Sequence, residues 1–234
     1  MKEKNKIIDI KMIPKSLGFL ILLFFFSSIP LIIFNLLHIN YHNFSDLGKI
    51  IYNLVCDIAF LAIILFAYRK TIIHDFKEFK KDIISNLELA LKYWGIGFLI
   101  MVISNIIITV ILQEGISQNE ETIRTLTDIA PLFMIFEVAI YAPLTEELIF
   151  RKGFKDVFKT KWLFVILSGF VFGGLHVISS IETAKDLLFL IPYCSLGFSF
   201  ALLYHKTDNI FHSISMHAMH NTAAIILYLI GASL

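Results

Sequence analysis

Two adjacent acids, Glu146 and Glu147, stand in an otherwise apolar stretch that ends at Arg151. On a helix, Glu147 and Arg151 face each other one turn apart, with the acid on the N-terminal side, which is the favourable order for an ion pair. Glu146 points about 100° away and is left without this partner. A carboxylate in an apolar site is suited to take a proton from water and pass it on. We therefore predict a supporting role for Glu147 and Arg151 and a chemical role for Glu146; the alternative is that both acids lie in a membrane interface beside the lysines that follow.

A histidine, His176, ends the motif Phe172-Gly173-Gly174-Leu175-His176. Adjacent glycines remove side-chain bulk, so they let a second helix or an extended peptide backbone approach closely. We therefore predict that His176 lies beside an opening. The alternative is a lone histidine that makes a hydrogen bond between helices.

A second histidine, His217, is followed four residues later by Asn221, and on a helix the two share one face. Two hydrogen-bond donors on one face can bind a single oxyanion. His212 and His220 lie toward other faces, and we leave His220 outside the predicted site. Small residues between these positions also favour close helix packing, so a polar packing seam is the alternative.

The composition indicates which elements position these groups. Hydrophobic residues make up 57% of the 234 residues and charged residues 17%, below the roughly 25% usual in soluble domains. The apolar residues gather in stretches of about 18 to 25 residues, long enough to cross roughly 30 Å of hydrocarbon as helices. The alternating pattern of a barrel strand is absent. The sequence therefore predicts an all-α, polytopic transmembrane helical bundle, and the net charge of +1 gives no basic field for nucleic acid.

Hydropathy and flanking charges predict about seven spans, and six to eight are compatible with the pattern. The predicted ranges are 17–39, 50–68, 93–113, 129–150, 162–180, 187–204 and 209–232. Lysine and arginine gather before the first span, after the second and after the fourth, whereas the intervening loops 40–49, 114–128 and 181–186 carry one each. The positive-inside rule then places the N-terminus in the cytoplasm and the C-terminus outside, in a multi-pass cell-membrane protein.

The remaining segments carry weaker signals. Residues 69–92 are typical either of an amphipathic stretch along the cytoplasmic surface or of a solvated loop. Residues 114–128 are predicted to form an external loop with room for a short helix. Cys56 and Cys194 lie within spans, where a thiol is usually an apolar filler. Further polar groups within spans, for which the sequence predicts no role, are Asp57, Asn53 and Glu137.

Depth in the membrane is a test of whether the site residues can meet. At 1.5 Å per residue, Glu146, His217 and His176 lie very roughly 8, 12 and 21 Å below the cytoplasmic surface. These groups reach from the cytoplasmic third to near the middle of the membrane. They can converge if the fifth span begins later or tilts.

Three motifs, in this order and each within a span, resemble the CAAX protease and bacteriocin-processing family, also called CPBP or Abi intramembrane proteases. They are Glu-Glu-x-x-x-Arg at 146–151, Phe-x-x-x-His at 172–176 and His-x-x-x-Asn at 217–221. The resemblance covers about residues 141–221. Residues 1–128 would then hold an N-terminal cytoplasmic segment and three spans, and residues 129–234 the protease core, within one integral membrane domain.

The resemblance also implies roles for the site residues. Glu146 and His176 would be the general base and its partner, which together activate a water molecule. His217 and Asn221 would form the oxyanion hole, with Glu147 and Arg151 in support. The implied activity is that of an intramembrane endopeptidase in the lipid bilayer. It would hydrolyse a membrane-associated peptide or membrane protein without a covalent intermediate, in peptide maturation or bacteriocin self-immunity.

The dependence on a metal ion is left open by the sequence. Glu146, His176 and His217 would be the ligands of a zinc site with two histidines and a carboxylate. Against this, the sequence has no His-Glu-x-x-His motif, and Asn221 is a poor zinc ligand. We therefore favour a glutamic protease without a cofactor over a zinc enzyme.

Two other classes of protein compete with this interpretation. A non-catalytic membrane scaffold or immunity protein of the same fold would bind a partner through the same cavity, but it needs no unpaired Glu beside His and Asn within a span. A small transporter with a proton relay would show two repeated halves with broken helices, which the sequence lacks. The sequence predicts neither the oligomeric state nor the bond that is cleaved.

Overall fold

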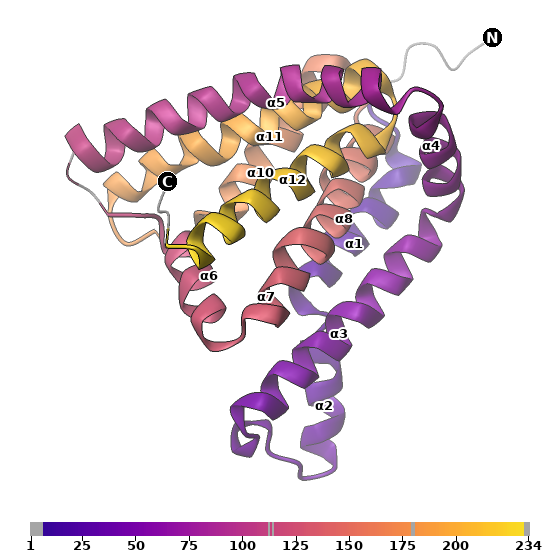
Figure 1. The fold of residues 1–234 in the computed structure, drawn as a ribbon. Helices are drawn as coiled ribbons and strands as arrows, with labels where there is room; N and C mark the ends of the chain where they lie inside the picture. Colours follow the sequence, from indigo (N-terminus) through magenta and orange to yellow (C-terminus); the bar gives the residue numbers. More distant parts are fainter. Residues whose placement is uncertain (1–6, 112, 114, 179–180, 232–234) are drawn as a thin grey trace.

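The computed structural model describes residues 7–231, except residues 112, 114, 179 and 180. The described residues are mostly helical and contain no strand, only an isolated antiparallel bridge between Ile8 and Phe158. Figure 1 shows one bundle of helices, with α2 and the start of α3 projecting from it. The predicted all-α class is therefore confirmed.

The first part of the described chain forms helices joined by short turns. These are α1 (Ile13–Phe25), α2 (Ser28–Leu36), α3 (Asp46–Ala67), α4 (Arg69–Lys81) and α5 (Ile83–Ile106), which continues as a π-helical segment at Ile107–Ile111. Short 3₁₀ turns at Ile10–Met12 and Tyr41–Asn43 precede α1 and α3. The start of α3 follows from its sequence, because the Ser45 hydroxyl accepts a hydrogen bond from the Gly48 N–H at 3.2 Å.

The second part of the described chain holds all the motif residues. It forms α6 (Gln118–Ile129), α7 (Pro131–Phe136), a π-helical segment (Glu137–Tyr141), α8 (Ala142–Glu146), a second π-helical segment (Glu147–Gly153), α9 (Phe154–Val157), α10 (Lys161–Leu175), a 3₁₀ segment (Ala184–Phe189), α11 (Leu190–Thr207) and α12 (Ile210–Leu229). From α7 to α9 the helical segments follow one another without a break. The two π-helical segments in this run flank α8, and such segments are frequent at functional sites.

The number of helices that could cross a membrane is smaller than the number of predicted spans. By length and hydropathy, three helices of the described chain qualify, namely Asp46–Ala67, Ile83–Val110 and Ala184–Thr207. A fourth span is added if Ile10–Phe25 and Ser28–Leu36, bent by 59°, are taken as one. Of the helices that carry the motifs, α10 is apolar but falls short of this criterion because it has 15 residues. The fold is therefore that of a membrane-embedded all-α bundle, for which the number of spans is approximate.

Several predicted boundaries are corrected by the structure. The span predicted at 17–39 is broken between Phe25 and Ser28, and the span predicted at 93–113 begins at Ile83. The short helix allowed for in the predicted loop 114–128 is present as α6 and runs one residue further, to Ile129. The span predicted to end at residue 150 continues as helix to Val157.

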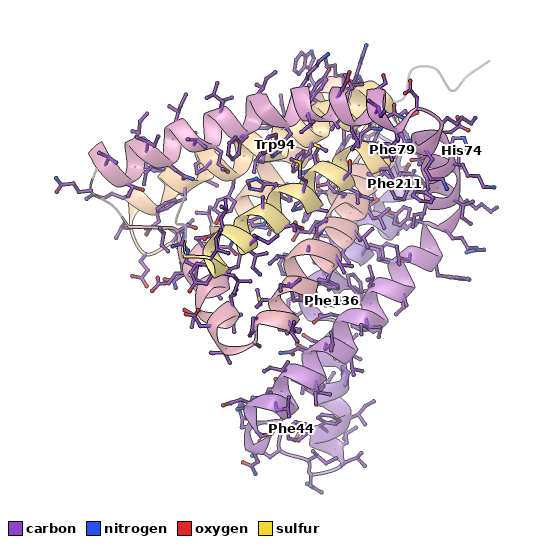
Figure 2. The ribbon with its side chains drawn as sticks, in the orientation of Figure 1. Phe44, His74, Phe79, Trp94, Phe136 and Phe211 are labelled. Carbon is purple, nitrogen blue, oxygen red and sulfur yellow. The ribbon has the colours of Figure 1, made fainter. Side chains whose placement is uncertain are left out.

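The segment between the second and third predicted spans contains a docked helix, α4, in which Asp75 and Phe79 are buried. The Asp75 carboxylate accepts a hydrogen bond from the Ile210 N–H at 3.0 Å, so α4 holds the start of α12. Figure 2 shows Phe79 and Phe211 at this junction, where their ring centroids lie 6.3 Å apart. Of the two predicted alternatives, the amphipathic stretch is therefore the better description of residues 69–81, and the solvated loop is wrong there.

The helices α10 and α11 pack closely, because few side-chain atoms separate their backbones. A Cβ atom added to Gly173 would lie 2.5 Å from the Cys194 Sγ and 2.7 Å from the Cys194 backbone N. A Cβ atom added to Gly174 would meet nothing within 4 Å. Of the two adjacent glycines, the first therefore permits close approach of a helix, and the second borders open space.

We expect Gly173→Ala to lower the free energy of unfolding by about 1–3 kcal/mol, because the added methyl group overpacks the contact with Cys194. Gly174→Ala is the matched control, and its effect should stay within about 0.5 kcal/mol. Thermal unfolding of the two purified variants in detergent measures the difference. Equal stability of the two variants would contradict the close packing of α10 on α11.

Candidate active site

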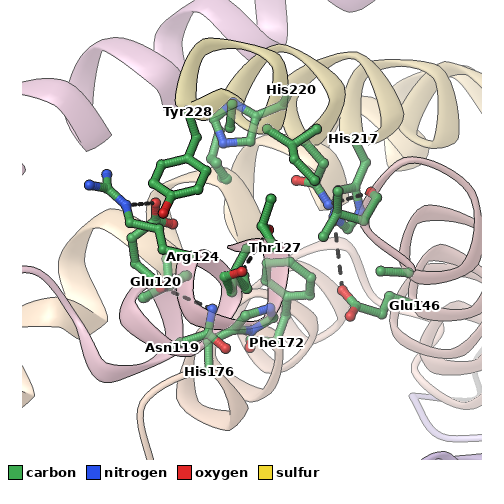
Figure 3. Close-up of a pocket in the computed structure, with 18 of the residues that line it drawn as sticks. Asn119, Glu120, Arg124, Thr127, Glu146, Phe172, His176, His217, His220 and Tyr228 are labelled. Carbon is green, nitrogen blue, oxygen red and sulfur yellow. Dashed lines mark hydrogen bonds and ion pairs between the residues drawn. The ribbon is translucent and has the colours of Figure 1, made fainter. Parts of the chain in front are cut away.

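One cavity of about 230 Å³ is lined by Glu146, His176, His217 and Asn221. Its walls come from α6, the run from α7 to α8, the end of α10, the first half of α11 and the second half of α12. Figure 3 shows Glu146 close to His217 and shows His176 beside Phe172 on the α10 wall. The structure therefore brings the four predicted catalytic residues to one place, although they come from three separate motifs.

Glu146 ends α8, and its side chain is 17% exposed. Its Oε2 atom lies 3.9 Å from the Nε2 of His217. The same oxygen is buried and has no hydrogen-bond partner among the described residues. A carboxylate oxygen at a cavity wall without such a partner is free to accept a hydrogen bond from water or from a substrate.

His217 lies between the two adjacent acids. Its Nδ1 is 3.0 Å from the Glu147 Oε1, and its Nε2 faces Glu146. The ring stacks on Phe200, with centroids 5.5 Å apart, and meets Phe172 edge-on at 5.7 Å. Because an ionised carboxylate only accepts hydrogen bonds, Nδ1 carries a proton toward Glu147. The packing and this hydrogen bond fix the orientation in which Nε2 meets the cavity.

Glu147 and Arg151 form the predicted ion pair, with the Glu147 Oε2 3.1 Å from the Arg151 Nε and both side chains fully buried. The guanidinium donates from Nη1 to the Ser168 hydroxyl at 2.9 Å, and its Cζ lies 4.6 Å from the Phe172 ring centroid. Ser168 in turn donates to the Phe150 carbonyl at 2.7 Å. The pair therefore ties the helix of Glu146 to α10, behind the cavity and outside its lining.

His176 follows the last residue of α10 and is held from two sides. Its Nδ1 lies 2.7 Å from the Phe172 carbonyl oxygen, so this nitrogen carries a proton and donates it. The ring stacks on Tyr193 of α11, with centroids 5.0 Å apart and an interplanar angle of 21°. In the neutral ring, Nε2 is then an acceptor. No hydrogen bond or ion pair joins His176 to Glu146 among the described residues, so any cooperation between them requires a water molecule or the substrate.

Asn221 lies one turn after His217 on α12, and both line the cavity. One N–H of the Asn221 side chain donates to the Val138 carbonyl at 2.9 Å. Val138 belongs to the π-helical segment that precedes α8. The second N–H of an amide group remains available for an oxyanion. The Val138 contact therefore orients the amide that the sequence predicted as a donor.

One wall of the cavity consists of residues that were not predicted from the sequence. Asn119, Glu120 and Arg124 of α6 line it, as does Tyr193. Arg124 Nε donates to the Glu120 Oε1 at 2.8 Å, and Asn119 Nδ2 donates to the Tyr193 hydroxyl at 3.2 Å. The amphipathic pattern of residues 118–129 was the feature of the sequence that could have indicated this wall, although we predicted a loop there. His220, which was left outside the site, also lines the cavity.

Two acids without a predicted role lie behind Glu146. The carboxyl groups of Asp57 in α3 and Glu137 lie close enough to interact. Glu137 also interacts electrostatically with Glu146. This pair links α3 to the run of helices that carries Glu146.

The ligand set predicted for zinc is not assembled. Among the residues that the structure describes, no three His, Cys, Asp or Glu side chains are arranged to hold a metal ion. Glu146 and His217 face each other, whereas no hydrogen bond or ion pair joins His176 to either of them among the described residues. The three side chains are therefore not arranged as a site with two histidines and a carboxylate, and no step below passes through a metal.

The fold and the cavity define a helical membrane protein whose buried carboxylate, imidazole and amide groups face one space, as in intramembrane proteases. The family described as "Type II CAAX prenyl endopeptidase Rce1-like" matches residues 128–223. A Bacillus subtilis (strain 168) protein named "Putative membrane peptidase YdiL" is 30% identical over 186 residues, which cover 76% of this chain and 72% of the relative. The chain therefore belongs to the Rce1-like family, which implies a membrane protease.

More distant relatives extend the similarity along the chain. "UPF0177 protein YvdC" of Lactococcus lactis (strain IL1403) is 21% identical over 211 residues, which cover 90% of this chain and 77% of the relative. "UPF0177 protein YbdI" of the same strain is 26% identical over 145 residues, which cover 58% of this chain and 76% of the relative. No solved structure matches this chain at a comparable level of significance.

Proposed function

We propose that this protein is an intramembrane endopeptidase that hydrolyses peptide bonds of a membrane-associated peptide or membrane protein. The observation that carries the proposal is the single cavity lined by a carboxylate, two imidazoles and a carboxamide, namely those of Glu146, His176, His217 and Asn221. Glu146 lines this space, and its buried Oε2 has no hydrogen-bond partner among the described residues. An ionisable group within a membrane bundle costs free energy, so a group that is kept there usually serves a function. The membership of the chain in the Rce1-like family supports the same conclusion.

In the proposed mechanism, a water molecule in the cavity donates one hydrogen bond to Glu146 and one to the Nε2 of His176. Glu146 takes a proton from this water as its oxygen attacks the carbonyl carbon of the peptide bond. The tetrahedral intermediate then collapses, the C–N bond breaks, and Glu146 returns the proton to the leaving amine. The products are a carboxylic acid and an amine, and no covalent enzyme intermediate forms.

The negative charge of the tetrahedral intermediate falls on the former carbonyl oxygen. In this proposal, the free N–H of Asn221 and a protonated Nε2 of His217 donate to that oxygen. The buried Glu147 carboxylate accepts a hydrogen bond from the Nδ1 of His217 and so holds the orientation of the ring. Donors held in place before the reaction are the most effective stabilisers of such a charge.

We expect Asn221→Ala to reduce turnover by about 10²–10³-fold, since one oxyanion donor is lost. The only hydrogen bond recorded for the side chain of Asn221 in the described structure is the one to Val138, so its removal should cost only about 1 kcal/mol of stability. Single-turnover rates and thermal unfolding of the purified variant measure the two effects. A large loss of stability together with normal turnover would contradict the role of Asn221.

The experiment that tests the proposed function uses purified protein in liposomes. Apolar peptides are added with and without a strong zinc chelator, and products are identified by mass spectrometry. We expect a defined internal cleavage at equal rates in both conditions. Cleavage that the chelator abolishes and zinc restores would contradict the metal-free mechanism, and no cleavage of any peptide would count against the protease.

The same proposal includes an orientation in the cell membrane, with the N-terminus in the cytoplasm and the C-terminus outside. Lysine and arginine are concentrated on α4 and on residues 152–161, whereas Lys49, Arg124 and Lys185 are the basic residues of the loops at the opposite end. The positive-inside rule places the basic end in the cytoplasm. Peptide maturation and bacteriocin self-immunity are the processes that we propose for such an enzyme.

A further inference from the structure

The cavity lies in the half of the bundle away from the basic end. On α10 its lining residues are Phe172 and the residue that follows the helix, His176, whereas the basic segment 152–161 precedes α10. On α12 the lining begins at His217 and runs to Tyr228 near the end of the helix. On α11, which runs the opposite way, the lining lies in the first half. In Figure 1, α4 and α6 lie at opposite ends of the bundle, and α6 is the helix that walls the cavity.

The other half of the bundle is closed beneath the site. Glu147, Leu148 and Arg151 are fully buried there, and so are Leu203 and Ile210. These residues come from the helix of Glu146, from α11 and from α12. Close-packed interiors of this kind leave no passage for water or a peptide. The basic end is therefore separated from Glu146 by a layer of packed side chains.

At the opposite end, the cavity is bordered by polar groups. The Ser117 hydroxyl, at the start of α6, lies 2.7 Å from the Tyr193 hydroxyl, and the Tyr228 hydroxyl donates to the Asp128 carboxylate at 2.9 Å. These contacts tie α6 to α11 and α12 across the mouth of the cavity. The side chains of Arg124 and Glu120 on this wall are 24% and 38% exposed. Polar and partly exposed side chains at this wall indicate that it meets water.

A second cavity of about 420 Å³ adjoins the first and shares several lining residues with it, among them Leu196, His220 and Ala224. Trp94 and Phe98 of α5 form its far wall, where their rings stack at a centroid distance of 4.6 Å. An apolar space beside the catalytic groups is suited to hold apolar side chains next to the scissile bond.

We infer that the catalytic cavity is entered from the face opposite the basic loops, which is the outer face of the cell membrane, and that the substrates are peptide segments presented there. The substrate class is a secreted apolar peptide or the outer membrane-flanking segment of a membrane protein, with apolar side chains next to the cleaved bond. This inference rests on the proposed function, by which the bound peptide is a substrate. It also rests on the orientation proposed above, by which this face is the outer one.

The test is the accessibility of single cysteines in intact cells. Cys56 and Cys194 are both buried and free, and both are replaced by Ala in the background chain. Ala224→Cys places a thiol at both cavities. The matched control is Ile226→Cys, two residues later. The side chain of Ile226 is 51% exposed and lines neither cavity. Lys159→Cys marks the basic end. A membrane-impermeant maleimide is applied before and after permeabilisation.

We expect the cysteine at 224 to react in intact cells at least about tenfold faster than that at 226, because a thiol facing lipid reacts poorly with a polar reagent. The cysteine at 159 should react only after permeabilisation. Labelling at 224 only after permeabilisation, together with 159, would overturn the inference, and so would absence of labelling at 224 in both conditions. Labelling of both 224 and 159 in intact cells would also overturn it, since the basic end would then be outside.

Cleavage distinguishes a failure of this inference from a failure of the proposed function. The same apolar peptide is displayed outside the cell or inside it, each fused to a membrane anchor. Cleavage of the outer display alone supports the inference, and cleavage of the inner display alone overturns it. External labelling at 224 without cleavage of either display would refute the protease while leaving the outward opening of the cavity in place.

Discussion

Glu146→Gln is expected to lower the rate of peptide cleavage by about a thousand-fold, or about 4 kcal/mol in the activation free energy. The amide keeps the size and one hydrogen-bond acceptor of the acid, but it cannot take a proton from water. Because the Glu146 Oε2 has no hydrogen-bond partner among the described residues, the substitution breaks no recorded hydrogen bond. The expected result is therefore a folded and inactive protein, measured by product formation in liposomes and by thermal unfolding.

The matched control is Glu121→Gln, which changes the same chemical group at an exposed position on α6 that does not line the cavity. This variant should cleave at the wild-type rate. A Glu146→Gln protein that still cleaves within about tenfold of wild type would exclude Glu146 as the general base. A biological effect that persists without any cleavage would instead favour a scaffold that binds its partner through the same cavity.

Arg151→Met is expected to destabilise the protein by about 3–5 kcal/mol, because it leaves the Glu147 carboxylate as a buried charge without its partner. Both side chains of this pair are 0% exposed. For a chain of this length the loss corresponds to roughly 10 °C or more in the melting temperature. Thermal unfolding in detergent and the amount of protein in membranes measure it. Arg69→Met is the control, because Arg69 is exposed and its loss should cost less than about 1 kcal/mol.

The double variant Glu147→Leu with Arg151→Met separates stability from chemistry. Removing both charges is expected to recover most of the lost stability, since apolar replacements of a buried pair are often neutral or better. Activity should stay low, because the Nδ1 of His217 then loses the carboxylate that lies 3.0 Å away. A double variant with full activity would contradict the role of Glu147 in orienting His217.

Short-range helix geometry made part of the site predictable from the sequence. His217 and Asn221 are four residues apart, and α12 carries both into the cavity, as a regular helix requires. The pairing of Glu147 with Arg151 follows the same rule, and the structure has it at 3.1 Å. The separate direction of Glu146 was also predictable, since adjacent residues on a helix diverge. The catalytic roles of these residues remain predictions.

Other features depend on contacts between distant helices and could not be predicted in this way. The π-helical segments at Glu137–Tyr141 and Glu147–Gly153 change the register of a helix without a marked change in composition. The proximity of Asp57 to Glu137 requires that α3 dock beside that helix. The wall formed by α6 was assigned to an external loop, because a short polar helix has no hydropathy signal of a span.

The number of spans was the least predictable feature of the fold. Hydropathy windows count apolar residues, and they cannot see that α1 and α2 are bent by 59° or that α10 ends after 15 residues. Helices that are buried within the bundle and line a polar cavity need not meet the length required of a lone span in lipid.

The measurement that tests the central claim most directly compares peptides in membranes from cells that produce the wild-type protein or Glu146→Ala at equal levels. Candidate peptides and small membrane proteins are co-expressed, and the products are identified by mass spectrometry. The account predicts at least one defined internal cleavage product that is present with the wild type and absent with the variant. Identical peptide profiles, together with a host phenotype that survives the substitution, would contradict it.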